Sequence, residues 1–250
     1  MLYVIPYIVY FLGPFLLAFF LGRKILKVTY RAFLIGLFAF FVAWVCILIV
    51  TVPTIMRDVM EGTILFSLVI SASAGLFEES SRFFAFNVFK GLREKRNWNT
   101  GIMYAIGHSG MESIIVGGSL LLTFVVVKHV PELLSPEILS QSKEVLEIGF
   151  LQSLYNSFER LLIGLLIHSC FTSVVLLSLV KSQKRYLLFA MLWHFVHNMV
   201  GLNLYRLSEH WIVEKLWILF IVVVYSLVLF KLRRKIANSS PKTLNNTNSK

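Results

Sequence analysis

Apolar residues fall into seven long runs along this chain, separated by short polar stretches. The runs cover approximately residues 2–22, 32–56, 63–89, 100–127, 150–180, 186–205 and 211–231. A helix needs about 20 residues to cross a bilayer, and each run is long enough to do so. The pattern predicts an all-α fold, a polytopic helical membrane protein with about seven transmembrane helices.

The same pattern predicts one transmembrane domain over residues 1–237, followed by a disordered tail over 238–250. The tail is polar and low in apolar residues, a composition typical of disorder. The first run has no basic residue before Arg23 and no small-residue cleavage pattern, so we expect a retained helix and not a signal peptide. The stretch 128–147 contains two prolines and is expected to hold a short surface helix.

Composition supports this class. The 250 residues are 57% hydrophobic and 15% charged, with a mean hydropathy of +0.77, which excludes an ordinary soluble domain. The net charge of +11 does not indicate nucleic acid binding, because the basic residues flank the apolar runs. Cys46 and Cys170 lie inside apolar runs, which favours buried thiols over a disulfide.

Most of the 24 basic residues fall in alternate loops. They follow the first, third, fifth and seventh runs, whereas the other loops contain only Arg57, Lys128, Lys143, Arg206 and Lys215. Short cytoplasmic loops are enriched in Lys and Arg. We therefore expect the N-terminus outside the cell membrane and the C-terminus in the cytoplasm.

Three charged residues interrupt the third run. Glu78 and Arg82 are four positions apart and share a helix face, and Glu79 is also within reach of Arg82. A charge at membrane depth is costly and usually marks a functional site facing the protein interior. The alternative is a self-neutralising ion pair that only fixes helix packing.

Further polar groups lie at the same depth, roughly 13–24 Å from the basic flanks at about 1.5 Å per residue. These groups are His108 and Glu112 in the fourth run, His168 in the fifth, and His194, His197 and Asn198 in the sixth. Within a core of residues 63–205, we expect Glu78, Glu112, His168, His194 and Asn198 to line one cavity. Each has a structural alternative. His108 with Glu112, and Glu159 with Arg160, could form local pairs, and His197 is expected to be structural.

Imidazoles and carboxylates are the ligands that a divalent metal such as zinc prefers, with an open position for water. A nearby carboxylate can then take the proton of that water. The spacing here is not HExxH, so the residue types alone leave the metal site a hypothesis.

The order of these residues resembles a known family. EExxR (Glu78, Glu79, Arg82), HxxxE (His108, Glu112), ER…H (Glu159, Arg160, His168) and HxxxN (His194, Asn198) are similar to YhfC-type intramembrane metalloproteases. These resemble the wider grouping of CAAX proteases, bacteriocin-processing enzymes (CPBP) and PrsW-like proteases. The spacing between Glu79 and Arg82 is one residue shorter than in CAAX proteases, and PrsW-like proteins have lysine in place of Arg82.

The resemblance implies an intramembrane endopeptidase that cleaves membrane-anchored proteins or peptides. Catalytic roles would fall to Glu78, Glu79, Arg82 and Asn198. Glu78 would activate water, and Asn198 would polarise the scissile carbonyl or hold the oxyanion. The resemblance implies a divalent metal, zinc, near His108, Glu112, His168 and His194, and it leaves the choice between His108 and Glu112 as ligand open.

Other functions fit some of these features. Carboxylates and histidines at membrane depth also build proton- or cation-coupled transporters, although the runs show no inverted repeat. A catalytically silent scaffold or immunity protein of the same fold is a third reading. A haem protein with paired histidine ligands would leave the carboxylates unexplained.

Overall fold

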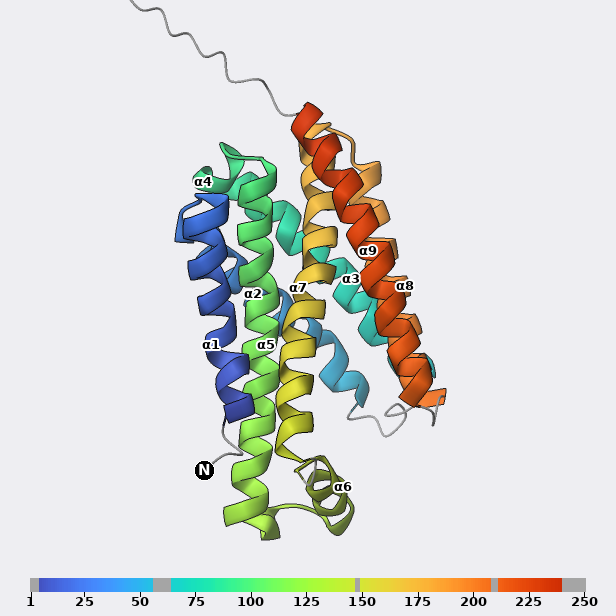
Figure 1. Ribbon diagram of the computed structural model, residues 1–250. Coiled ribbons are helices and arrows are strands. Elements are labelled where there is room, and N and C mark those ends of the chain that lie inside the picture. Colours follow the sequence, from blue (N-terminus) through green and yellow to red (C-terminus); the bar gives the residue numbers. More distant parts are fainter. Residues whose placement is uncertain (1–4, 56–63, 147–148, 208–210, 240–250) are drawn as a thin grey trace, which may run out of the picture.

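The computed structural model describes residues 5–55, 64–146, 149–207 and 211–239, and the regular structure of these residues is entirely helical (Figure 1). The long helices are α1 (Ile5–Phe20), α2 (Tyr30–Ile55), α3 (Ile64–Val88), α5 (Trp98–His129), α7 (Phe150–Val180), α8 (Arg185–Leu207) and α9 (Trp211–Ser239). The short ones are the π-helix η2 (Leu21–Leu26), α4 (Lys90–Arg93), the 3₁₀-helix η3 (Pro131–Leu133) and α6 (Pro136–Leu146). The predicted all-α class is confirmed.

Seven helical segments in the described part of the chain are long and apolar enough to cross a membrane. They match the seven predicted runs, with the first extended by η2 to Leu26. The expected short helix between the fourth and fifth spans is α6. The predicted tail lies almost wholly outside the described residues.

The helices pack around two central members, α5 and α7. Helix α5 contacts α1, α2 and α7, while α7 also contacts α8 and α9. Helix α3 crosses behind them and packs against both α2 and α8 (Figure 1). This crossing brings α3, α5, α7 and α8 together in the middle of the bundle, which is where the polar residues were expected to meet.

Helices α2 and α5 approach so closely that only glycine fits between them. A Cβ atom on Gly107 would lie 2.0 Å from the carbonyl oxygen of Phe33, and one on Gly36 would lie 2.2 Å from that of Tyr104. A close backbone approach of this kind is the usual role of small residues between transmembrane helices. It fixes the position of His108, the next residue along α5.

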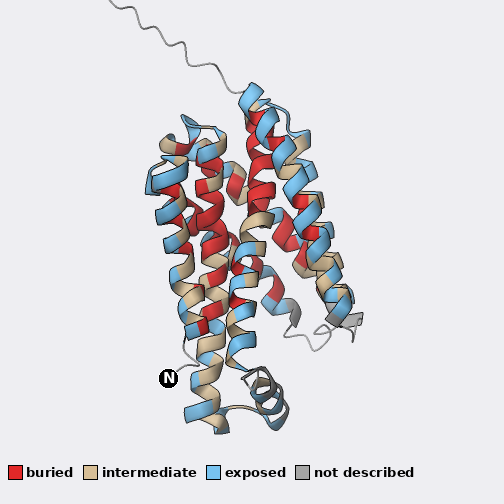
Figure 2. Cartoon of the chain, viewed as in Figure 1, coloured by how far each residue is buried: buried red, intermediate tan, exposed pale blue. Residues whose placement is uncertain are grey.

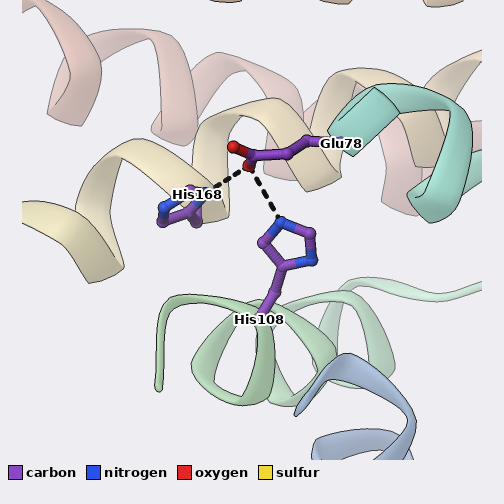
Figure 3. A group of neighbouring side chains, drawn as sticks. All are labelled: Glu78, His108 and His168. Carbon is purple, nitrogen blue, oxygen red and sulfur yellow. Dashed lines mark hydrogen bonds and ion pairs between the residues drawn. The ribbon is translucent and has the colours of Figure 1, made fainter. Parts of the chain in front are cut away.

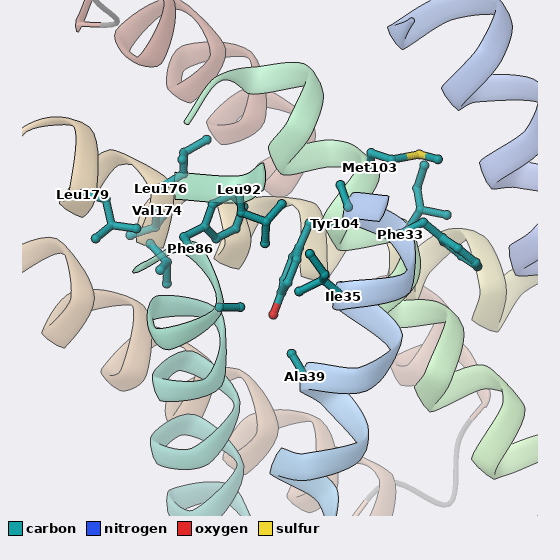
Figure 4. Close-up of a cluster of buried hydrophobic side chains, with 14 of the residues drawn as sticks. Phe33, Ile35, Ala39, Phe86, Leu92, Met103, Tyr104, Val174, Leu176 and Leu179 are labelled. Carbon is teal, nitrogen blue, oxygen red and sulfur yellow. The ribbon is translucent and has the colours of Figure 1, made fainter. Parts of the chain in front are cut away.

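Buried residues are concentrated in the upper half of the molecule as drawn in Figure 2. The main cluster joins α2, α3, α5 and α7, and includes Phe33, Phe86, Met103, Tyr104 and Leu176 (Figure 4). Tyr104 and Phe86 are fully buried, with ring centroids 5.0 Å apart. Since Tyr104 lies one helical turn before His108, this core anchors the part of α5 that carries the polar site.

Candidate active site

Helix α3 contributes a buried ion-pair network. Arg82 is completely buried and donates hydrogen bonds to both carboxylates, through Nη1 to Glu79 Oε1 and through Nη2 to Glu78 Oε2 at 3.3 Å. The sequence predicted that Arg82 would lie beside these carboxylates, and the contacts confirm it. Two carboxylates share one guanidinium, so this network alone retains one negative charge.

Small residues in α3 allow α8 to come close. A Cβ atom on Gly75 would lie 2.6 Å from the carbonyl oxygen of Met191 in α8. The small residues Ser71, Ser73 and Ala74 are also buried. This close approach places His194, on the next turn of α8, against the carboxylates of α3.

His194 is held by Glu79, and both side chains are buried. His194 Nδ1 lies 2.7 Å from Glu79 Oε1. A carboxylate can only accept a hydrogen bond, so Nδ1 carries the proton and the lone pair lies on Nε2. That Nε2 atom lies 3.9 Å from Glu78 Oε1. Glu79 thus orients the imidazole so that its lone pair is on the side of Glu78.

His168 is oriented in the same way by Glu112. His168 Nε2 donates to Glu112 Oε2 at 2.7 Å, which leaves the lone pair on Nδ1. Arg82 Nη2 lies 2.6 Å from this Nδ1 and can only donate, so both neighbours require the same tautomer. The Nδ1 atom lies 3.9 Å from Glu78 Oε2.

His108 completes the group. Its Nε2 atom lies 3.1 Å from Glu78 Oε2, and its Nδ1 atom is buried with no hydrogen-bond partner among the described residues. Phe40 packs edge-on against the ring, with centroids 4.9 Å apart. Glu78, His108 and His168 each offer one possible ligand atom, and these three atoms lie within 4.8 Å of one another (Figure 3).

This donor set fits a divalent metal such as zinc. Three imidazoles surround one carboxylate, and two of them are hydrogen-bonded from behind by other carboxylates, as is usual for metal-binding histidines. With Arg160 pairing to Glu112 at 3.2 Å, the group holds three carboxylates against two guanidiniums. The excess of negative charge favours a cation.

A cavity of about 400 Å³ opens onto this group. Its lining includes all five residues that were expected to share one cavity: Glu78, Glu112, His168, His194 and Asn198. A second cavity of about 550 Å³ shares Glu78, Glu112, Arg160, His197 and Asn198 with the first, and most of its other lining residues are apolar. The expectation that these five residues line one cavity is confirmed.

Two of the local pairs that the sequence suggested are not formed, and their members have other partners. Arg160 contacts Glu112 and not Glu159, whose partner is Lys215 at 3.2 Å. His108 contacts Glu78, so it forms no local pair with Glu112.

His197 has the structural surroundings that were expected. Its Nδ1 atom lies 2.9 Å from the hydroxyl of Tyr225, and its ring stacks on Trp217 with centroids 5.7 Å apart. The side chain also lines both cavities, at the edge of the polar group.

Some neighbours of the site had no signal in the sequence. Phe171 stacks on His194, with ring centroids 4.4 Å apart, and Tyr10 and Ser113 line the first cavity. These residues lie inside apolar runs and resemble any core position. Only the placement of the helices shows that they border polar groups.

The chain is similar to a known protein family. The family model described as YhfC intramembrane metalloprotease matches residues 8–224 of this chain. The match covers most of the chain and includes every residue of the polar group. No curated protein and no solved structure matched the chain in the same comparisons.

Proposed function

The chain belongs to the YhfC intramembrane metalloprotease family, and we propose that it is an endopeptidase that cleaves membrane-anchored proteins or peptides with a water molecule activated in the central cavity. One observation carries the proposal. Three imidazoles face the buried carboxylate of Glu78, and the tautomers of two of them are fixed by Glu79 and Glu112. An ion pair that served only to fix helix packing would not require this arrangement.

The imidazoles of His108, His168 and His194 would hold a divalent metal, with zinc as the candidate that fits the donor set. To bind it, His168 Nδ1 would exchange its hydrogen bond from Arg82 for the metal, and His108 would carry its proton on Nδ1 so that the lone pair of Nε2 is available. Such an ion supplies a bound water that loses its proton near neutral pH, and it polarises a carbonyl group. Glu112 was expected among the ligands. It lies behind His168 and hydrogen-bonds to it, so we propose that Glu112 orients that imidazole and that His108 is the ligand.

Glu78 is the proposed general base. Its carboxylate lies between the imidazoles and borders the cavity, where it can take a proton from water and deliver it to the leaving amine. Arg82 holds one oxygen of this carboxylate in place through a hydrogen bond from Nη2 at 3.3 Å. Glu79 is fully buried, so its role is to position Arg82 and His194.

Asn198 is proposed to bind the substrate. It lies one helical turn after His194 and lines both cavities. Its amide can donate a hydrogen bond to the scissile carbonyl and to the oxyanion that forms from it. A donor of this kind in a site shielded from water typically contributes about 10²–10³ in rate.

The proposal is tested with protein purified into liposomes containing quenched transmembrane peptides, and in cells by comparing membrane protein fragments. Glu78→Gln keeps the shape of the side chain and removes the base, so cleavage should fall by about 10²–10⁴. Glu94→Gln is the matched control, because Glu94 is exposed at a helix end and pairs only loosely with Lys90 at 3.9 Å. Its cleavage should match that of the wild type.

The result that contradicts the proposal is also specific. If Glu78→Gln, Glu79→Gln and His194→Ala all leave cleavage at the wild-type level, the protein is not a protease of this kind. Cation flux that these same changes abolish would then indicate a transporter. If the changes alter neither cleavage nor cation flux, a silent scaffold is indicated.

A further inference from the structure

A groove runs between α8 and α9. Both helices pack on α7, but they make little contact with each other, so α7 forms the floor of the groove. The groove has a volume of about 520 Å³. Its lining residues are Val174, Leu177, Arg185, Tyr186, Phe189, Trp193, Val224, Val228, Leu232 and Lys235.

The chemistry of the groove changes along its length. Arg185 at the start of α8 and Lys235 near the end of α9 lie at one end, and the described lining includes no acidic residue. The remaining lining is mostly aliphatic and aromatic. From Lys235 to Val224 the wall extends about 17 Å along α9, at about 1.5 Å per residue.

We propose that this groove binds one anionic glycerophospholipid. The phosphate would lie between Arg185 and Lys235, and an acyl chain would follow the apolar wall of α9 over Val228 and Val224. The charged end of the groove lies at the end of the bundle where the basic residues of the loops and tail are concentrated. This end faces the lipid head groups, so an anionic phosphate can reach it. A soluble anion would use the charged end alone and leave the apolar length uncovered.

This inference does not depend on protease activity, but the groove is close to the site. Trp193 lines the deep end of the groove and packs against Phe171, with ring centroids 5.2 Å apart. Phe171 in turn stacks on His194 at 4.4 Å. The half-buried Trp193 is therefore in a position to report on an acyl chain in the groove.

The test measures tryptophan fluorescence of the full chain in phosphatidylcholine nanodiscs. Phosphatidylglycerol with dibrominated acyl chains is added at increasing mole fraction, because bromine quenches an indole that it contacts. The Trp193→Phe variant identifies the part of the signal that belongs to Trp193. We expect saturable quenching of that part at low mole fraction, and weaker, linear quenching by dibrominated phosphatidylcholine.

The head-group contact is tested by charge. Arg185→Gln with Lys235→Gln should weaken the apparent affinity for phosphatidylglycerol by about 30-fold, because each basic residue near an anionic lipid contributes about fivefold. Lys231→Gln with Arg233→Gln is the matched control. It removes the same charge from the same end of α9 at exposed positions outside the groove lining.

Three results would overturn the proposal. Equal quenching by both brominated lipids would mean that the groove contacts bulk lipid without selecting it. An equal loss of affinity in the control variant would assign the preference to general surface charge. Competition by soluble glycerol phosphate would show that the acyl chain is not needed.

Discussion

The close contact between α2 and α5 gives a prediction that does not depend on the proposed chemistry. Gly107 lies at this contact, where an added Cβ atom would be 2.0 Å from the carbonyl oxygen of Phe33. The obstacle is backbone, so no side chain can rotate away. An ordinary contact requires at least 3.4 Å, so Gly107→Ala must move the helices apart by about 1.4 Å.

The expected cost follows from this displacement. Inserting one methyl group into a well-packed interface typically costs about 1–3 kcal/mol, and the rigid backbone contact places Gly107→Ala in the upper part of that range. Alanine favours a helix over glycine by up to about 1 kcal/mol, which offsets part of the loss. We therefore expect a net decrease of about 2 kcal/mol in the free energy of unfolding.

The assay is reversible unfolding in mixed micelles, with helix content followed by circular dichroism. Gly118→Ala is the matched control, since it lies on the same helix and its Cβ would meet only Phe11 Cζ at 3.8 Å. The free energy of unfolding of Gly118→Ala should equal that of the wild type or be slightly higher. The reasoning fails if Gly107→Ala is as stable as the wild type, or if both variants lose equal stability.

Three further predictions concern the site and the topology. Glu112→Gln should weaken metal binding by about 10–100-fold, as measured by chelator competition, because it disturbs the orientation of His168, and unchanged affinity would refute this role. Arg82→Ala should lower the free energy of unfolding by about 3–5 kcal/mol, because it leaves two buried carboxylates without a cation. A thermal unfolding midpoint equal to that of the wild type would contradict this prediction. Reporter fusions after Lys95 and Lys143 should lie on opposite sides of the membrane, and the same side for both would exclude the proposed orientation.

The sequence was sufficient to predict the helices because each span is a long apolar run with polar ends. The polar layer was also predictable, since Glu78, His108, His168 and His194 stand out against apolar neighbours at a common depth. Helical spacing correctly placed Arg82 beside Glu78 and Glu79, because those contacts lie within one helix.

Contacts between helices could not be predicted in the same way. The partner of Glu112 is His168, 56 residues away, and the partner of Glu159 is Lys215 on α9. Such pairs depend on how each helix is rotated and how closely it approaches its neighbour. The close approach depends on residues such as Gly75 and Gly107, whose role becomes visible only when the opposing backbone is in place.

The metal content of the purified protein tests the central claim most directly. Plasma mass spectrometry should find about one divalent ion per wild-type chain, with zinc the expected element, and dialysis against a strong chelator should remove it. His194→Ala and His108→Ala should each reduce the content severely, while Glu94→Gln should retain it. A wild-type chain that is folded yet binds no divalent metal after exposure to zinc, or a His194→Ala variant that binds as much as the wild type, would contradict the account.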